Sequence, residues 1–460
     1  MTDNRASTGP GHGISFADAL RVWMRIALLS FGGPAGQIAV MHRILVDEKK
    51  WIGEERFLHA LNFCMMLPGP EAQQLAIYIG WLLHRVKGGL AAGILFVLPG
   101  LVAIMALSWL YVLAIDAAPV AALLFGVKAA VVAIVFQAVV RIGKRSLGHP
   151  ARMAVAAASF LALFLFGAPF PLIILAAGMG GWLAGRAGLA AFAGGGGHGA
   201  KGGAILHDAD SALGTEMPEH ARQGFGRLAW VAAILLALWL VPVALLAALA
   251  PPDSAFADIA AFFSKLALLT FGGAYAVLAW VGQAAVEHYH WLTPGEMLDG
   301  LGLAESTPGP LIIVTQYVGF LAAFRHPGGL DPLLAGTLGG LLTTWVTFVP
   351  CFLWIFVGAP FVEQLRHNRA LTSALAAISA AVVGVILNLA CWFALHYWFA
   401  RVSDARIGPL RLNLPDLGSI DPAAAILSAA ALVAILRFGR GVLTTLAACA
   451  LAGLVWKLAF

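Results

Sequence analysis

Long apolar runs alternate along this chain with short polar loops and with turns of glycine and proline. Five runs, near residues 88–113, 117–140, 228–250, 332–358 and 370–397, reach the roughly 20 apolar residues that a membrane-spanning helix needs. They lack the period-two alternation of strands in a membrane barrel. The pattern therefore predicts a bundle of membrane-spanning helices.

Other apolar segments are too short to cross a bilayer alone. Residues 54–67 would form about 21 Å of helix, against about 30 Å of hydrocarbon. Residues 18–30, 38–46 and 70–83 are similarly short, and glycine and proline turns separate them. Short, broken apolar segments at corresponding places in two halves of a chain indicate the binding site of a transporter.

The broken region occurs twice in the sequence. Three landmarks recur at an offset of 240 (271−31, 291−51 and 308−68): Phe31-Gly32-Gly33 as Phe271-Gly272-Gly273, Trp51 as Trp291, and Pro68-Gly69-Pro70 as Pro308-Gly309-Pro310. Further along, Pro99 pairs with Pro350 at an offset of 251 (350−99). We predict an internal repeat of roughly 120 residues per copy.

The number of spans between the copies predicts their relative orientation. Three apolar segments separate them, at residues 151–166, 171–183 and 228–250, and an odd number places the second copy in the opposite orientation to the first. Basic clusters on both sides of the first long pair predict cytoplasmic ends there and place Asp116 outside. Four arginines of the second half would then lie outside, against that rule: Arg325, Arg401, Arg406 and Arg411.

Composition excludes an ordinary soluble protein. Of 460 residues, 61% are hydrophobic and only 11% charged, and the mean hydropathy is +0.88. The net charge of +5 lies in short clusters at the ends of apolar runs, so membrane topology explains it better than a nucleic-acid partner. Four cysteines are scattered singly, and we expect no disulfide framework, no metal and no cofactor. The N-terminus shows no apolar signal-peptide region.

The predicted fold class is an all-α polytopic membrane protein with two inverted repeats, whose broken or re-entrant helices meet near the bilayer midplane. The predicted organisation is a disordered cytoplasmic N-terminus (1–14), a first repeat (15–145), a connecting transmembrane pair (146–187), a flexible Gly-rich cytoplasmic linker (188–226), a connecting helix (227–250), a second repeat (255–398), and an amphipathic loop with C-terminal transmembrane segments (399–460).

Three motifs of the first copy resemble those of a known family. FGGPAGQIAVMHR at residues 31–43, VDEKKWI at 46–52 and LPGPEAQQLAIYIG at 67–80, with their degenerate second copy, resemble the chromate ion transporter family in its long two-domain form. The resemblance covers nearly the whole chain outside residues 188–226. It implies a bacterial inner-membrane protein that moves chromate out of the cell at the expense of the proton gradient. The second copy departs from the first, with Ala274 in place of Pro34 and Leu311 in place of Glu71.

A chromate-like dianion in a dry site needs several fixed hydrogen-bond donors. Helix N-termini at the breaks would supply unpaired N–H groups and a partial positive charge, and neutral amides and hydroxyls would add donors. The expected substrate-binding residues are Gly32, Gly33, Gln37, Asn62, Pro68, Gly69, Gln73, Gln74, Lys128, Gly272, Gly273, Thr307, Gly309, Gln316 and Tyr317. The alternative is that the glycines and prolines only form turns and that the polar side chains only join helices.

Five charged residues carry more specific expectations. Lys128, deep in an apolar span, is a candidate for substrate binding or coupling, and otherwise snorkels or pairs with a carboxylate. Glu71 and Glu305 beside the Pro-Gly-Pro turns are candidates for proton coupling, although Glu71 at a helix start also complements the helix dipole. Arg21 and Arg25 line an access path or contact lipid headgroups.

The function predicted from these features is chromate export coupled to protons, conferring chromate resistance, by a protein embedded in lipid. A carrier of sulfate or another tetrahedral oxyanion is the nearest alternative, because chromate and sulfate share charge and shape. An anion channel would keep the broken helices without a coupling carboxylate. An enzyme is not expected, since the chain has neither H-E-x-x-H nor G-x-S-x-G. Glycine patches at Gly89/Gly93 and Gly336/Gly340 permit close packing within one protomer or in a homodimer.

Overall fold

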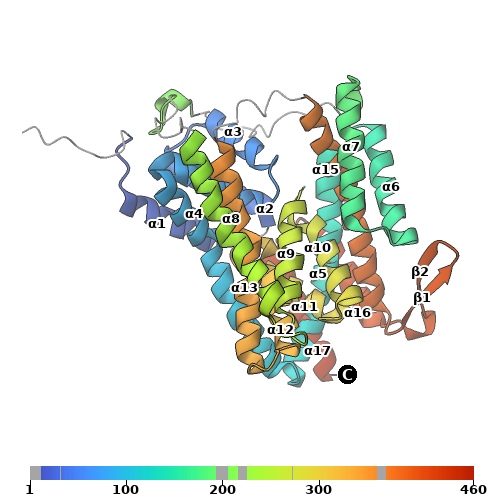
Figure 1. The fold of residues 1–460 in the computed structure, drawn as a ribbon. Coiled ribbons are helices and arrows are strands. Elements are labelled where there is room, and N and C mark those ends of the chain that lie inside the picture. The colour runs from blue at the N-terminus through green and yellow to red at the C-terminus, as the bar shows by residue number, and fades with distance from the viewer. Residues whose placement is uncertain are drawn as a thin grey trace, which may run out of the picture.

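The computed structural model describes residues 12–31, 33–192, 206–215, 225–271, 273–359 and 369–459. Helices dominate these residues (Figure 1). The first half contains α1 (Phe16–Leu29), α2 (Gly33–His42), the π-helix η1 (Arg43–Glu48), α3 (Glu54–Cys64), α4 (Glu71–Ala114), α5 (Ala118–Ser146), α6 (Pro150–Phe166) and α7 (Phe170–Arg186).

The second half repeats this order of elements. After η2 (Ala190–Phe192), η3 (Asp208–Asp210) and α8 (Phe225–Leu249) come α9 (Phe256–Leu269), α10 (Ala274–Gln283), η5 (Ala284–His288), α11 (Pro294–Ser306), η6 (Leu311–Ile313), α12 (Val314–Arg325), α13 (Pro332–Gly358), α15 (Arg369–Trp398), β1 (Val402–Ile407), β2 (Leu410–Pro415), η8 (Leu417–Ser419), α16 (Pro422–Leu436) and α17 (Val442–Ala459). Six helices of the described part are long and apolar enough to cross a membrane. The prediction of an all-α, multi-pass membrane protein is confirmed.

Local sequence signals set the helix boundaries. Thr293 caps α11 with a capping box, since its side chain accepts from the Glu296 N–H while the Glu296 carboxylate accepts from the Thr293 N–H. Helix α4 is two helices joined at a break: His84 has φ −135° and ψ 33°, and Arg85 has φ 56° and ψ −149°. The first piece corresponds to α12 and the second to α13, so the break in α4 stands where the second half has the loop between these helices.

Equivalent long helices of the two halves run antiparallel along each other. A Cβ on Gly89 would lie 2.6 Å from the Phe356 ring, and at the other end of α4 the Trp109 Nε1–H donates to Thr337 Oγ1 at 3.0 Å. The N-terminal part of this stretch of α4 therefore lies beside the C-terminal part of α13. An antiparallel course is what an inverted repeat requires, and the inversion itself stays a prediction.

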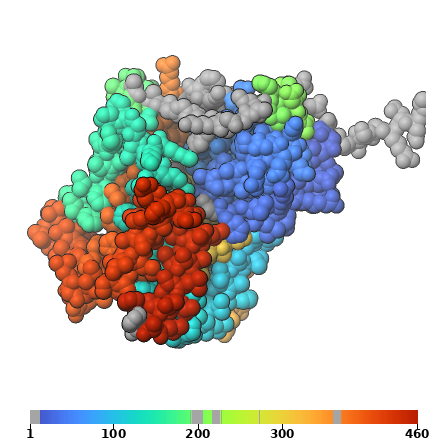
Figure 2. Space-filling model, turned by 180° about the vertical axis from the view of Figure 1, so that it is seen from behind, coloured from blue at the N-terminus to red at the C-terminus, as the bar shows by residue number. Residues whose placement is uncertain are grey.

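The last two helices of each half pack against the other half. Helices α6 and α7 lie on α15, and α16 and α17 lie on α5. Glycines allow these close approaches, because a Cβ on Gly181 would lie 2.6 Å from Ala377 Cβ, and one on Gly126 would lie 1.9 Å from the Cys449 carbonyl oxygen. Figure 2 shows the C-terminal helices, in red, on the outer face of the molecule. The two halves are therefore interlocked.

The predicted glycine patches are occupied within the chain. Phe356 and Phe352 fill the space beside Gly89 and Gly93. In the second half, Phe320 packs on Gly336, while Met105 and Gln316 pack on Gly340. A homodimer stays a prediction, and these patches do not supply its surface.

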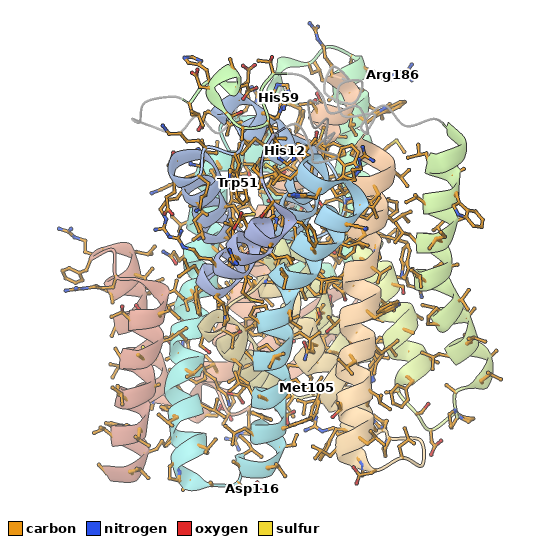
Figure 3. All side chains as sticks on the ribbon, turned by 90° about the vertical axis from the view of Figure 1, so that its left-hand side faces the viewer. His12, Trp51, His59, Met105, Asp116 and Arg186 are labelled. Carbon is orange, nitrogen blue, oxygen red and sulfur yellow. The ribbon has the colours of Figure 1, made fainter. Side chains whose placement is uncertain are left out.

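The molecule has two distinct ends. His12, His59 and Arg186 lie toward one end, which we call the upper end, and Asp116 lies at the opposite, lower end (Figure 3). Large apolar side chains such as Leu113, Leu249 and Leu451 are exposed on the helices. A soluble surface would not expose so many apolar side chains, and lipid covers them readily.

Part of the predicted linker packs against the first repeat. Residues 206–215, which we call the strap, lie on the loop before α3: the Ala212 N–H donates to the Lys50 carbonyl at 3.0 Å and the Leu213 N–H to the Trp51 carbonyl at 3.1 Å. A Cβ on Gly53 would lie 2.6 Å from Asp208 Cα, so only glycine allows this contact. Residues 193–205 and 216–224 are outside the described residues.

The loop before α16 contains the two strands of the described fold. Strands β1 and β2 form an antiparallel hairpin that pairs Val402 with Pro415 and Ile407 with Leu410. Gly408 turns the chain with φ +59°. The sequence predicted only an amphipathic loop here.

Candidate functional site

Four breaks in helices define the candidate site. The first half has one break between α1 and α2 and one between α3 and α4, and the second half has breaks between α9 and α10 and between α11 and η6. Glycines at these breaks have positive φ: Gly33 +77°, Gly69 +126°, Gly273 +100° and Gly309 +111°. Residues with side chains rarely adopt such angles, so glycine is what allows the chain to turn here.

Backbone hydrogen bonds join each break to one in the other half. The Gly69 N–H donates to the Thr270 carbonyl and the Gly309 N–H donates to the Ser30 carbonyl, both at 2.8 Å. These four residues are equivalent in pairs, since 309−69 and 270−30 both equal 240. The four breaks therefore meet inside the bundle. The Gly69 and Gly309 N–H groups are occupied in this conformation and are not available to an anion.

The middle parts of α4 and α13 pack against this crossing. A Cβ on Gly100 of α4 would lie 2.8 Å from the Pro308 carbonyl oxygen. On the other side, a Cβ on Gly69 would lie 3.0 Å from Cys351 Sγ of α13. Gly100 and Cys351 are equivalent positions at the offset of 251. The crossing is thus enclosed by the same pair of helices that run antiparallel to each other.

A small pocket opens at the crossing, between the halves. It is lined by Pro34, Gln37, Pro70, Glu71, Ala72, Thr270, Gly273, Ala274, Pro310, Leu311 and Ile312. All four breaks contribute to this wall. Helices α4 and α10 start in it, at Glu71 and Ala274, and the first N–H groups of a helix have no partner within the helix. Of the expected site residues, Gln37, Glu71 and Gly273 line the pocket.

Three glutamines of the first half are buried around the breaks. Gln37 Nε2 donates to the Gly309 carbonyl at 2.5 Å, and Gln74 Nε2 donates to the Pro68 carbonyl at 2.7 Å. The second side-chain atoms, Gln37 Oε1 and Gln74 Oε1, and both side-chain polar atoms of Gln73 have no hydrogen-bond partner among the described residues. Buried polar groups without partners are costly, so these amides have capacity to bind a ligand.

Other expected residues make structural contacts instead. Gln316 Nε2 donates to the Leu101 carbonyl at 2.9 Å, and Thr344 donates to Gln316 Oε1 at 3.3 Å. Gln316 therefore joins helices, which was the alternative to substrate binding. Thr307 Oγ1 donates to the Ala304 carbonyl at 3.1 Å. Asn62 is exposed on α3 and does not line the pocket. Gly32 and Gly272 lie outside the described residues.

The two candidate coupling carboxylates have different surroundings. Glu71 stands at the start of α4 in the wall of the pocket. Glu305 is buried in α11 and accepts a hydrogen bond from the Tyr275 hydroxyl. Arg141 of α5 lies near Glu305 and Tyr275. Only Glu71 is placed to meet an ion in the pocket directly.

The proposed access residues form ion pairs on the surface. Arg21 Nη1 lies 2.9 Å from Asp18 Oδ1, and the Ser15 hydroxyl together with Arg21 holds the pKa of Asp18 below its usual value. Arg25 Nη1 lies 2.7 Å from Glu48 Oε2. Their positive charges therefore have carboxylate partners in this conformation, and an access path stays a prediction.

Lys128 pairs with a carboxylate that the sequence did not single out. Its Nζ lies 3.2 Å from Asp299 Oδ2, on α11 of the other half. Tyr111 also donates to Asp299 Oδ2, at 3.1 Å, and its ring meets the Tyr317 ring edge to face at 5.3 Å between centroids. In the sequence, the only sign of Asp299 as a functional residue was its position among the apolar residues of a short helical segment. No spacing pattern connects it to a lysine in the other half.

A multi-pass helical protein in which broken helices from two similar halves cross around a buried pocket has the architecture of a membrane transporter. This chain belongs to the chromate transporter family, which it matches at residues 17–182 and 257–454. That family consists of transporters and not of enzymes. No solved structure matches the fold.

Named relatives cover most of the chain. The chromate transport protein of Pseudomonas aeruginosa is 32% identical over 376 residues, which are 81% of this chain and 80% of that protein. The chromate transport protein of Cupriavidus metallidurans is 27% identical over 366 residues, 79% of each chain. The probable chromate transport protein of Synechococcus elongatus is 25% identical over 376 residues, 81% of this chain and 83% of that protein.

Proposed function

We propose that this protein exports chromate across the bacterial inner membrane, driven by the proton gradient, and so confers chromate resistance. The family and its chromate-transporting relatives support the substrate. The observation that carries the proposal is the pocket at the crossing of the four breaks, lined by both halves. A site between two repeats can be exposed to each side of the membrane in turn when the halves rock.

The groups in the wall of the pocket suit a tetrahedral dianion, although the pocket, at about 10 Å³, must widen from this conformation to admit one. Helix starts at Glu71 and Ala274 offer backbone N–H groups and a partial positive charge. The Gln37 NH2 has two N–H groups, of which one donates to the Gly309 carbonyl and the other is left to donate to an ion. Neutral donors bind an oxyanion without a full countercharge, so the ion can also leave. Sulfate has the same shape and charge, and it is the competing substrate that the experiment must distinguish.

Glu71 is the proposed coupling residue at this pocket. A carboxylate in the wall repels a dianion when ionised and stops repelling it when protonated. Occupation of the pocket and the protonation state of Glu71 are therefore linked. Glu305, which is held by Tyr275 away from the pocket lining, is the second proposed coupling residue.

The antiparallel course of α4 and α13 supports the inverted orientation of the halves, with the upper end in the cytoplasm. In this orientation the arginines of the second half lie on the outside. Three of them have acidic partners: Arg325 Nη2 contacts Glu296 at 2.5 Å, Arg401 contacts Asp416 at 2.7 Å and Arg411 contacts Asp404 at 2.9 Å. Each charge is thus held locally at the surface.

Everted membrane vesicles test the proposal. Uptake of labelled chromate is measured with and without a protonophore, and with sulfate as competitor. Accumulation that depends on the gradient and that Gln37→Leu reduces would support export through this pocket. Asn62→Leu is the matched control, because Asn62 is exposed and lies outside the pocket, so uptake should stay unchanged.

Three other outcomes would change the proposal. Uptake of sulfate without chromate would replace the substrate and keep the carrier. Flux that never exceeds equilibrium and ignores the protonophore would indicate a channel. A Gln37→Leu protein that is folded and transports at the normal rate would remove the pocket from the pathway.

A further inference from the structure

The Lys128–Asp299 pair is a buried charge contact between the two halves. Lys128 is one third of the way along α5, and Asp299 lies in the middle of α11. The Lys128 side chain keeps 23% of its surface exposed, while the Asp299 side chain keeps 2%. A buried carboxylate needs a cation, and the exposed part of Lys128 leaves that cation within reach of a second anion.

The contacts on Asp299 are unevenly distributed. Oδ2 receives both Lys128 and the Tyr111 hydroxyl, whereas Oδ1 is buried without a hydrogen-bond partner in the described residues. The Tyr317 hydroxyl, also fully buried, makes no hydrogen bond of good geometry with the described part of the chain. A cation, the Tyr111 hydroxyl that donates to a carboxylate oxygen, and the Tyr317 hydroxyl beside Tyr111 therefore lie together.

Neighbouring charged groups leave Lys128 as the cation of this cluster. Glu296, one turn earlier on α11, pairs with Arg325. Tyr397 of α15 donates to the Phe125 carbonyl at 2.7 Å, and Lys457 of α17 lies over the Phe125 ring at 4.6 Å. Arg325 lies near both tyrosines, but Glu296 holds it, so an incoming anion would meet Lys128, Asp299 and the two tyrosines.

The pair has no counterpart in the repeat. At the offset of 240, Asp299 corresponds to His59, and at the offset of 251, Lys128 corresponds to Ser379. Serine carries no charge, so the two equivalent positions cannot form an ion pair with each other. This difference favours a role in function over a role required by the fold.

We propose that Asp299 is an internal substitute for the transported anion: it holds Lys128 in the empty protein, and an incoming oxyanion takes its place on Lys128 with hydrogen bonds from Tyr111 and Tyr317. The cluster is a second anion site, separate from the pocket at the helix breaks. This inference rests on the proposed transport of an oxyanion. It adds that the Asp299 carboxylate competes with the oxyanion for Lys128.

Equilibrium binding of labelled sulfate and chromate to the purified full-length protein tests this role without requiring transport. Asp299→Asn keeps the shape and removes the competitor, so we expect binding about tenfold tighter than in the unchanged protein, equivalent to about 1.4 kcal/mol. Lys128→Met should abolish the gain when combined with Asp299→Asn. Asp253→Asn, which makes the same change at an exposed position, is the control and should leave the affinity unchanged.

The double variant also separates folding from binding. Lys128→Met alone leaves Asp299 buried without its cation and is expected to lower the thermal unfolding temperature, which the added Asp299→Asn should restore. Equal affinity of Asp299→Asn and the unchanged protein would overturn the inference, as would tight binding by the double variant. If Asp299→Asn binds more tightly but vesicles accumulate no oxyanion, the proposed transport fails and the site stands.

Discussion

The two halves of the molecule share a backbone plan but surround it with different side chains. Each half has a glycine that donates to the carbonyl before the other half's glycine turn, at the same 2.8 Å. Around these contacts, Gln37 and Glu71 of the first half correspond to Val277 and Leu311 of the second. The repeat thus forms the crossing, while the polar wall of the pocket comes mainly from one half.

Replacing the crossing glycines tests the shared part and should give the largest effect. In Gly309→Ala the residue keeps φ near +111° and its Cβ meets Gly100 Cα at 3.2 Å, so neither backbone can yield easily. Strain of this kind costs roughly 1–3 kcal/mol before the contact is added. We expect a marked loss of thermal stability in detergent and no transport.

Gly69→Ala is a milder version of this test, because its Cβ would meet side chains and not backbone atoms. Gln74 Nε2 at 2.7 Å and Cys351 Sγ at 3.0 Å can move, so the loss of stability should be smaller than for Gly309→Ala. Gly148→Ala, with nothing within 4 Å of its Cβ, is the control. Equal stability of Gly309→Ala and the control would contradict the importance of the crossing.

Glu71→Gln tests the part in which the halves differ. The amide preserves the shape of the pocket wall but cannot exchange a proton, so accumulation driven by the proton gradient should fall to the level seen with a protonophore. Measurement in everted vesicles compares it with Glu305→Gln, whose side-chain oxygen can still accept from Tyr275. If Glu305→Gln reduced proton-driven accumulation more than Glu71→Gln, the main coupling residue would be Glu305 of the second half.

Gln37→Leu should have an intermediate effect on stability. It removes the donor to the Gly309 carbonyl and leaves that buried oxygen with one partner fewer, at a cost of about 1–3 kcal/mol. Thermal unfolding compares it with Asn62→Leu, which replaces an exposed amide and loses no hydrogen bond at the crossing. Similar unfolding temperatures for both variants would show that the Gln37 contact does not stabilise the crossing.

The loops before α3 and α11 offer the mildest test. The Trp51 carbonyl accepts from Leu213 of the strap, and the equivalent Trp291 carbonyl accepts from Arg325 Nη1 at 2.6 Å. Gly53→Ala should expel the strap and speed its cleavage by a protease, with a change in global stability under about 1 kcal/mol. Unchanged cleavage kinetics would mean that the strap does not depend on this contact.

Much of the helical framework could be predicted from the sequence. Glycine and proline mark the breaks, and apolar length marks the long helices, because both signals are local. The order Thr293-Pro-Gly-Glu296 is likewise a local capping-box signal, and α11 begins there. The equivalence of the halves followed from landmarks at one offset, but their crossing did not, since hydrogen bonds such as Gly69 to Thr270 depend on how the halves meet.

The parts that escaped prediction depend on contacts between distant segments. Asp299 is an unremarked carboxylate until folding brings it to Lys128 in the other half. The strap binds mainly through backbone groups, which leave no apolar periodicity in the sequence. The hairpin at Val402–Pro415 is short and half-exposed, and its Arg411 gains partners in Asp404 and Glu287 only in the folded protein.

The interlocked packing of α5 with α16 and α17 has a consequence for biosynthesis. Translation delivers α5 to the membrane early, while the two helices that cover it follow only after α15 has been made. Lipid must occupy the surface around Gly126 until Cys449 arrives and displaces it. Packing around α5 is therefore completed only when α16 and α17 arrive, and a nascent chain halted before α16 is left with an incomplete first half.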